Sequence, residues 1–145
     1  YINFLDTDCP YCWEEGVELS NMHQAFSEDV IFINVMVSLE ITGHDSSREE
    51  VQAFRDKTPF GDNDNNGDGC YSGRKDCAER PGEAHTWMYV DDLTNSIAGD
   101  WELPGTPFSV ILDGGGTVVW NQAQSENHPP GEEVGNALAR LLGGE

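Results

Sequence analysis

The fold is decided by residues 1–26, which read YINFLDTDCPYCWEEGVELSNMHQAF. The first five are mostly apolar, and they stop at Asp6-Thr7-Asp8, polar residues typical of the point where a strand gives way to a helix. Pro10 stands where a first helical residue belongs, because its φ is preset and it has no N–H to leave unpaired. This stretch therefore predicts a strand, a turn carrying two cysteines, and a helix.

The predicted helix is amphipathic. Glu14, Glu18 and Asn21 fall on one face, whereas small and apolar residues recur at helical spacing on another. That inward set is Cys12, Gly16, Leu19, Met22 and Phe26. Cys9 is thereby placed at the start of the helix and Cys12 one turn further in, on the buried side.

The rest of the chain alternates strand and helix signals. Val30–Val37 is almost continuously apolar, as a central parallel strand covered on both faces should be. Ser46 and Ser47 offer capping-box starts for a helix that ends before Thr58-Pro59. A hairpin of 108–112 and 117–120 and a closing helix with Val134, Leu138 and Leu141 follow.

Residues 60–82 interrupt this order. They are crowded with Asp, Asn and Gly and lack apolar periodicity, so they predict an inserted acidic loop. Regular structure is expected to resume near Thr86–Val90. The predicted fold class is therefore α/β in one domain spanning 1–145, with a central mixed sheet flanked by helices.

The net charge of the protein limits the kinds of partner that it can bind. The chain has 145 residues, with 27 Asp and Glu against 7 Lys and Arg, a formal charge of −20. This repels nucleic acid and favours cationic partners or metal ions. No apolar run approaches the ~18–20 residues of a membrane span. Because the sequence opens abruptly in a core strand, we expect that a leader, anchor or tether was trimmed before Tyr1.

The four cysteines form two close pairs. At a helix start, Cys9 faces unpaired N–H groups that favour thiolate, so it is the expected nucleophile, and Cys12 is placed to resolve the mixed disulfide. The alternatives are an inert disulfide or a zinc site completed by Cys70 and Cys77, although the two spacings do not match. A structural Cys70–Cys77 disulfide is expected to close the insert, and it favours a periplasmic, secreted or tethered location.

The order of strand, CPYC, helix, strand, helix, insert, Thr-Pro, hairpin and helix resembles the thioredoxin superfamily, and within it the redoxin or TlpA-like thiol-disulfide oxidoreductases. The likeness covers nearly the whole chain outside the insert. It implies a thioredoxin-like fold in which Pro107 is cis and Thr106 exposes its backbone to a substrate peptide. Pro10 and Tyr11, between the cysteines, are expected to contact the substrate. The alternative for Pro107 is an ordinary trans proline.

Glu15 lies three residues after Cys12 and is predicted to share its inward face. A partly desolvated carboxyl there would have a raised pKa, suited to proton exchange with the Cys12 thiol. The TlpA-like branch carries a glutamate at the matching position. The alternative is a solvated side chain near the helix start.

The insert also suggests a cation site. Asp62, Asp64, Asn66 and Asp68 alternate oxygen-bearing side chains around a tight turn, as in a calcium loop, and Asp76 could fold back to replace the missing twelfth-position glutamate. A solvated turn in an acidic protein is the other interpretation.

These observations predict an enzyme that exchanges its Cys9/Cys12 dithiol with protein thiols or disulfides, alongside a redox partner protein. No organic cofactor is expected, and calcium is the candidate ion. The alternatives are a non-enzymatic calcium-binding module on the same fold and a peroxiredoxin-like peroxidase. The peroxiredoxin threonine three residues before the reactive cysteine is Asp6 here.

Overall fold

A computed structural model of the chain describes residues 1–39, 45–61, 69–123 and 132–143. It is an α/β structure built on a mixed five-stranded sheet, ordered β3-β2-β1-β4-β5. The strands are β1 (Ile2–Leu5), β2 (Ile33–Val37), β3 (Met88–Asp92), β4 (Phe108–Leu112) and β5 (Val118–Asn121). β1, β2 and β3 run parallel, whereas β4 is antiparallel to β1 and to β5.

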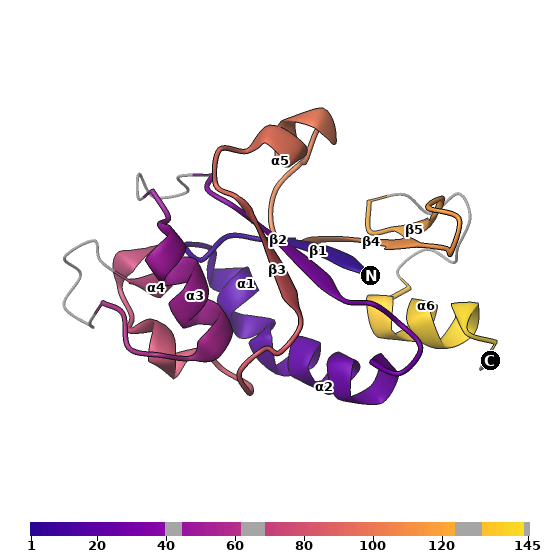
Figure 1. The fold of residues 1–145 in the computed structure, drawn as a ribbon, viewed down its shortest axis with the longest axis horizontal. Coiled ribbons are helices and arrows are strands. Elements are labelled where there is room, and N and C mark those ends of the chain that lie inside the picture. The colour runs from indigo at the N-terminus through magenta and orange to yellow at the C-terminus, as the bar shows by residue number, and fades with distance from the viewer. Residues whose placement is uncertain (40–44, 62–68, 124–131, 144–145) are drawn as a thin grey trace.

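Helices cover both faces of this sheet (Figure 1). One apolar cluster joins β1, β2 and β4 to α1 (Pro10–Glu14), α2 (Gly16–Phe26), α3 (Arg48–Asp56) and α6 (Val134–Leu141). The opposite cluster, which includes Phe4, Val35 and Val110, packs against α5 (Ser96–Asp100). Since strand side chains alternate between faces, Asn3 and Leu5 of β1 lie on the α2 side and Phe4 on the α5 side.

Two predicted boundaries differ from the structure, and one helix was not predicted. The central strand begins at Ile33 rather than Val30, and β3 spans Met88–Asp92 rather than starting at Thr86. The short helix α5 follows β3 and has no counterpart in the predicted elements. Its N-terminal N–H groups are held by a tertiary partner, because the carboxylate of Asp92 accepts from Ile97 N at 3.0 Å and Ala98 N at 2.9 Å.

The single helix predicted from Pro10 to Phe26 is broken at Glu15 into α1 and α2. Gly16, the first residue of α2, lies so close to the following loop that a Cβ there would come within 2.3 Å of the Pro81 carbonyl oxygen. Gly82, with φ +86°, makes the reciprocal approach, since its Cβ would meet the Gly16 oxygen at 2.5 Å. Two glycines therefore allow backbone to pack on backbone at the break.

The predicted loop 60–82 contains regular structure where it is described, which corrects that expectation. Cys70–Gly73 forms α4 and Cys77–Glu79 a 3₁₀ turn, and Cys70 and Cys77 are joined by the expected disulfide. The turn is capped by Asp76, whose Oδ1 accepts from Ala78 N at 3.0 Å and Phe60 N at 2.9 Å. This segment lacks apolar periodicity, and it is held instead by a disulfide and by a side-chain cap.

We predict that Gly16→Ala destabilises the protein by about 1–3 kcal/mol, the usual cost of overpacking, because the methyl group meets a backbone oxygen. Gly135→Ala in α6 is the matched control. Its nearest contact would be Met22 Sδ at 3.7 Å, so it should be neutral or slightly stabilising. Urea unfolding of the oxidised protein measures both, and equal midpoints for the two variants would contradict the prediction.

Candidate dithiol site

Cys9 lies beyond the carboxyl end of β1 and caps the first turn of α1. Its backbone is extended, with φ −84° and ψ 120°, and its Sγ accepts a hydrogen bond from Cys12 N at 3.2 Å. The turn before it is closed by Cys9 N, which donates to the Asp6 carbonyl at 3.1 Å. The thiol is therefore fixed at the helix start by backbone groups on both sides.

The two thiols are free and inequivalent. A hydrogen bond from the Cys12 thiol is the largest of the effects that lower the pKa of Cys9 to about 7, and burial opposes them. Burial raises the pKa of Cys12 well above that of an ordinary thiol. At neutral pH one sulfur is thus available as a thiolate, while the other keeps its proton until its surroundings change.

The Thr106–Pro107 peptide bond is cis, the conformation expected from the sequence. Because β4 runs antiparallel to β1, the residues before β4 are brought to the edge at which β1 ends. The Cys9 Sγ lies 3.6 Å from the Thr106 carbonyl oxygen. Residues almost 100 positions apart in the sequence therefore meet at the nucleophile.

Pro10 and Tyr11 flank the thiols differently. Pro10 is half-buried, but the Tyr11 side chain is 72% exposed, although it follows a nearly enclosed Cys9. A large exposed aromatic ring beside a reactive sulfur offers contact area to a second molecule.

Glu15 caps the break between α1 and α2 and is half-buried. Its Oε1 accepts from Asn3 Nδ2 at 3.4 Å, and its Oε2 is shielded from solvent without a hydrogen-bond partner among the described residues. Burial, followed by repulsion from Glu18, raises the pKa of Glu15 to about 7. The negative charge of Cys9 also raises this pKa, so the carboxyl lies within electrostatic reach of the dithiol.

The polar turn before Cys9 is fully buried, a feature that the sequence did not reveal. Asp6 Oδ2 accepts from Leu39 N at 2.8 Å, and its Oδ1 accepts from Asp8 N at 2.9 Å and Ser46 Oγ at 3.0 Å. Burial raises the pKa of Asp6, and these hydrogen bonds counteract it. The carboxylate thus ties the turn to the segments that follow β2.

The disulfide segment also packs on the site. Tyr71 N donates to the Thr7 carbonyl at 3.0 Å, and the Tyr71 ring lies edge-on to Trp13 with centroids 5.7 Å apart. Trp13 is buried and packs in this contact. The Cys70–Cys77 crosslink is itself fully buried, so it braces α1 without being presented to a second molecule.

A buried cation supports the α1–α2 break from behind. The Arg80 guanidinium is fully enclosed and donates to the carbonyls of Phe54 at 2.5 Å, Pro81 at 2.8 Å and Glu83 at 2.9 Å. Its Nη1 also lies 3.1 Å from His85 Nε2, which must accept because arginine only donates. Burial and this positive neighbour lower the pKa of His85 to about 3, which rules out the imidazole as an acid or base near neutral pH.

The described residues include only one of the predicted calcium ligands. Asp62, Asp64, Asn66 and Asp68 lie outside them, and Asp76 uses its carboxylate to cap the 3₁₀ turn. Within residues 1–39, 45–61, 69–123 and 132–143, no three His, Cys, Asp or Glu side chains group as metal ligands would. Calcium binding stays a prediction.

The described residues include no helix of the length and apolarity that crossing a membrane requires.

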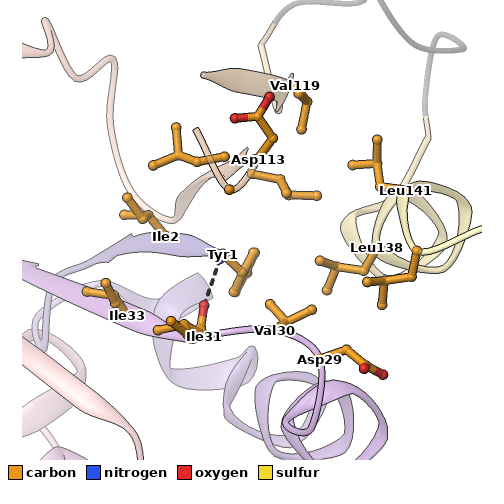
Figure 2. A pocket seen from close by; sticks show the side chains of 14 residues that line it. Tyr1, Ile2, Asp29, Val30, Ile31, Ile33, Asp113, Val119, Leu138 and Leu141 are labelled. Carbon is orange, nitrogen blue, oxygen red and sulfur yellow. Dashed lines mark hydrogen bonds between the residues drawn. The ribbon is translucent and has the colours of Figure 1, made fainter. Parts of the chain in front are cut away.

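A cavity among the described residues lies away from the dithiol. It measures about 520 Å³ and lies between the amino ends of β1 and β2, the β4–β5 turn and α6. Figure 2 shows apolar side chains around it, among them Val30, Val119 and Leu138, with Asp29 and Asp113 also in the lining. No cysteine or histidine lines it, so it offers nothing to thiol chemistry.

We predict that Cys12→Ala raises the pKa of Cys9 by about one pH unit, since it removes the thiol that donates to the nucleophile. Cys12→Ser keeps an O–H donor at the same place and should raise it less. The rate of Cys9 alkylation against pH gives the midpoint in each variant, where Cys9 is the remaining free thiol. A midpoint near 7 in Cys12→Ala would contradict the assigned cause.

Comparison with known proteins identifies no relative. No family model, no curated protein and no solved structure matches this chain.

Proposed function

We propose that this protein is a thiol-disulfide oxidoreductase of the thioredoxin-like type, acting on protein thiols or disulfides through Cys9 and Cys12. The observation that carries the proposal is the asymmetry of the pair. Cys9 has a pKa of about 7 at the start of a helix, and Cys12 is buried one turn away with a raised pKa. A structural or metal-binding pair has no need of one activated and one protected thiol.

The architecture supports the same reading. The structure keeps the order of strand, CPYC, helix, strand, helix, insert, Thr-Pro, hairpin and helix on which the resemblance to the thioredoxin superfamily rests, with β3 and α5 between the insert and Thr-Pro. The Thr106–Pro107 bond is cis, as that resemblance implies. The helices lie on both faces of a mixed sheet, with the dithiol at the edge where β1 ends. The location we propose is extracytoplasmic, in keeping with the buried Cys70–Cys77 disulfide.

In the reducing direction, the Cys9 thiolate attacks one sulfur of a substrate disulfide. The substrate S–S bond breaks, a Cys9–substrate disulfide forms, and the departing thiolate takes up a proton. Cys12 then loses its proton and attacks Cys9 Sγ, which releases the second substrate thiolate and leaves a Cys9–Cys12 disulfide. Two electrons pass to the substrate, and the reverse sequence oxidises it. The reduction potential of the pair sets the direction.

Glu15 is the proposed acceptor for the Cys12 proton. A carboxyl with a pKa of about 7 is half ionised at neutral pH, so it can both take up and return a proton there. An ordinary exposed glutamate is ionised at that pH almost all the time, and it is a poorer proton donor.

We predict that Cys9→Ser abolishes disulfide exchange, because the hydroxyl is not ionised and does not attack a disulfide. Cys12→Ser should still attack but not resolve, so mixed disulfides with substrate should accumulate. Insulin reduction and non-reducing mass spectrometry measure the two effects. Cys77→Ser paired with Cys70→Ser is the control, because it leaves the dithiol intact. Exchange by Cys9→Ser at the wild-type rate would disprove the assignment.

We also predict that Glu15→Gln slows turnover near pH 7 by up to about 10²-fold, the low end of general acid–base contributions, while the fold is kept. The amide preserves shape but carries no exchangeable charge. Glu14→Gln is the matched control, since Glu14 is the neighbouring exposed carboxylate. In exchange rates from pH 5 to 9, the inflection near 7 that comes from the Cys9 thiolate should persist in both variants, and only Glu15→Gln should lose the part of the pH dependence that Glu15 contributes. Identical profiles in the two variants would remove Glu15 from the mechanism.

A further inference from the structure

Polar residues form a row across the buried face of the sheet. Asn3 of β1 pairs in register with Ser109 of β4 on one side and with Asn34 of β2 on the other. Asn34 in turn pairs with Tyr89 of β3. The four strands, of which β1, β2 and β4 are otherwise apolar, therefore each place one polar side chain at the same level. Asn3 and Asn34 are fully buried, and Ser109 is almost so.

Part of this row is a hydrogen-bond chain that ends on Glu15. The Tyr1 hydroxyl lies 3.0 Å from Ser109 Oγ, Ser109 Oγ donates to Asn3 Oδ1 at 3.0 Å, and Asn3 Nδ2 reaches Glu15 Oε1 at 3.4 Å. The four groups come from the residue before β1, from β1 itself, from β4 and from the α1–α2 break. Residues 106 positions apart, Asn3 and Ser109, are held in register by the sheet.

The hydrogen bonds of this chain all donate in one direction. An ionised Glu15 only accepts, so the amide must turn its Nδ2 toward Glu15 and its Oδ1 toward Ser109. The single Ser109 proton then goes to Asn3, and Tyr1 must donate to Ser109. Every donor thus points toward the carboxylate, and aligned hydrogen bonds in a low-dielectric interior polarise one another. The arrangement stabilises the charged form of Glu15.

We propose that Asn3 is a positioning residue that holds the Glu15 carboxylate beside the dithiol, and that Ser109 and Tyr1 orient Asn3. The catalytic meaning of this arrangement rests on the proposed function, but the arrangement itself does not.

The other groups that affect the pKa of Glu15 disfavour its charged form. Among the described residues, the titratable groups that shift the pKa of Glu15 are Glu18 on α2 and Cys9 at the start of α1, and the neutral Tyr1 hydroxyl just before β1 faces it through the hydrogen-bond chain. Glu18 and Cys9 disfavour a second negative charge, as does burial. Asn3 is the side chain that counteracts them. Without it, Glu15 would be a neutral acid over more of the physiological pH range and unable to accept the Cys12 proton.

The test is a carboxyl NMR titration of protein labelled with ¹³C at the glutamate side chains, with the Glu15 signal identified by its loss in Glu15→Gln. Asn3→Leu removes the donor at similar volume and should raise the Glu15 midpoint by about one pH unit, a tenfold change in the ratio of ionised to neutral carboxyl. Ser109→Ala releases Asn3 and should raise the midpoint by less, in the same direction.

Ser20→Ala is the matched control. Ser20 is a buried serine whose hydroxyl donates to the Gly16 carbonyl at 2.9 Å and takes no part in the chain, so its loss should leave the midpoint in place. If circular dichroism shows that Asn3→Leu is unfolded, the Glu15 midpoint in Ser109→Ala alone decides the test. Midpoints in Asn3→Leu and Ser109→Ala equal to that of Ser20→Ala would overturn the proposal. A shifted midpoint with an unchanged exchange rate in Glu15→Gln would uphold the positioning but refute the proton-transfer role.

Discussion

The close approach of Gly16 to the Pro81–Gly82 peptide is the contact on which the site depends. Backbone meets backbone there, since a Cβ on Gly16 would lie 2.3 Å from the Pro81 oxygen. The contact lies at the break between α1 and α2, next to Glu15, whose carboxyl accepts a hydrogen bond from Asn3 of the sheet. Arg80 holds the other side of the contact by donating to carbonyls from α3 and from its own loop. A fully buried cation is costly unless its hydrogen bonds are satisfied, and here they are.

Several polar side chains are buried in the described part of the protein, and they have two different roles. Asp6 and Arg80 bind mainly backbone groups, and they fix the turn before Cys9 and the loop behind Gly16. Asn3 and Ser109 instead form a connected set beneath Glu15. Asp6 and Arg80 satisfy backbone hydrogen-bonding groups where the chain has no regular secondary structure. Asn3 and Ser109 adjust the charge of one carboxyl, and their cost in desolvation is met by their own hydrogen bonds.

Electrostatic effects within the site are short-range despite the charge of −20 on the whole chain. The pKa of Cys9 is lowered mainly by its neighbour Cys12, and that of Glu15 is raised mainly by burial. Exposed acids act more on partners than on the thiols, because salt screens them over about 10 Å. A cationic or neutral surface around the substrate disulfide is therefore the better match for this protein.

The sequence by itself determined the local features. Pro10 preset the first helical turn, the apolar spacing after it put Cys12 inside, and the glycines after Asp113 predicted the hairpin of β4 and β5. Each depends on residues within one turn of one another. What only the tertiary structure decided are the contacts between distant segments: the burial of Asp6, the split of the helix at Glu15, and the alignment of Asn3 with Ser109. Spacing along a chain fixes which face of an element a side chain occupies. The strand that lies opposite is set only when the sheet assembles, and that strand decides whether the side chain finds a hydrogen-bond partner.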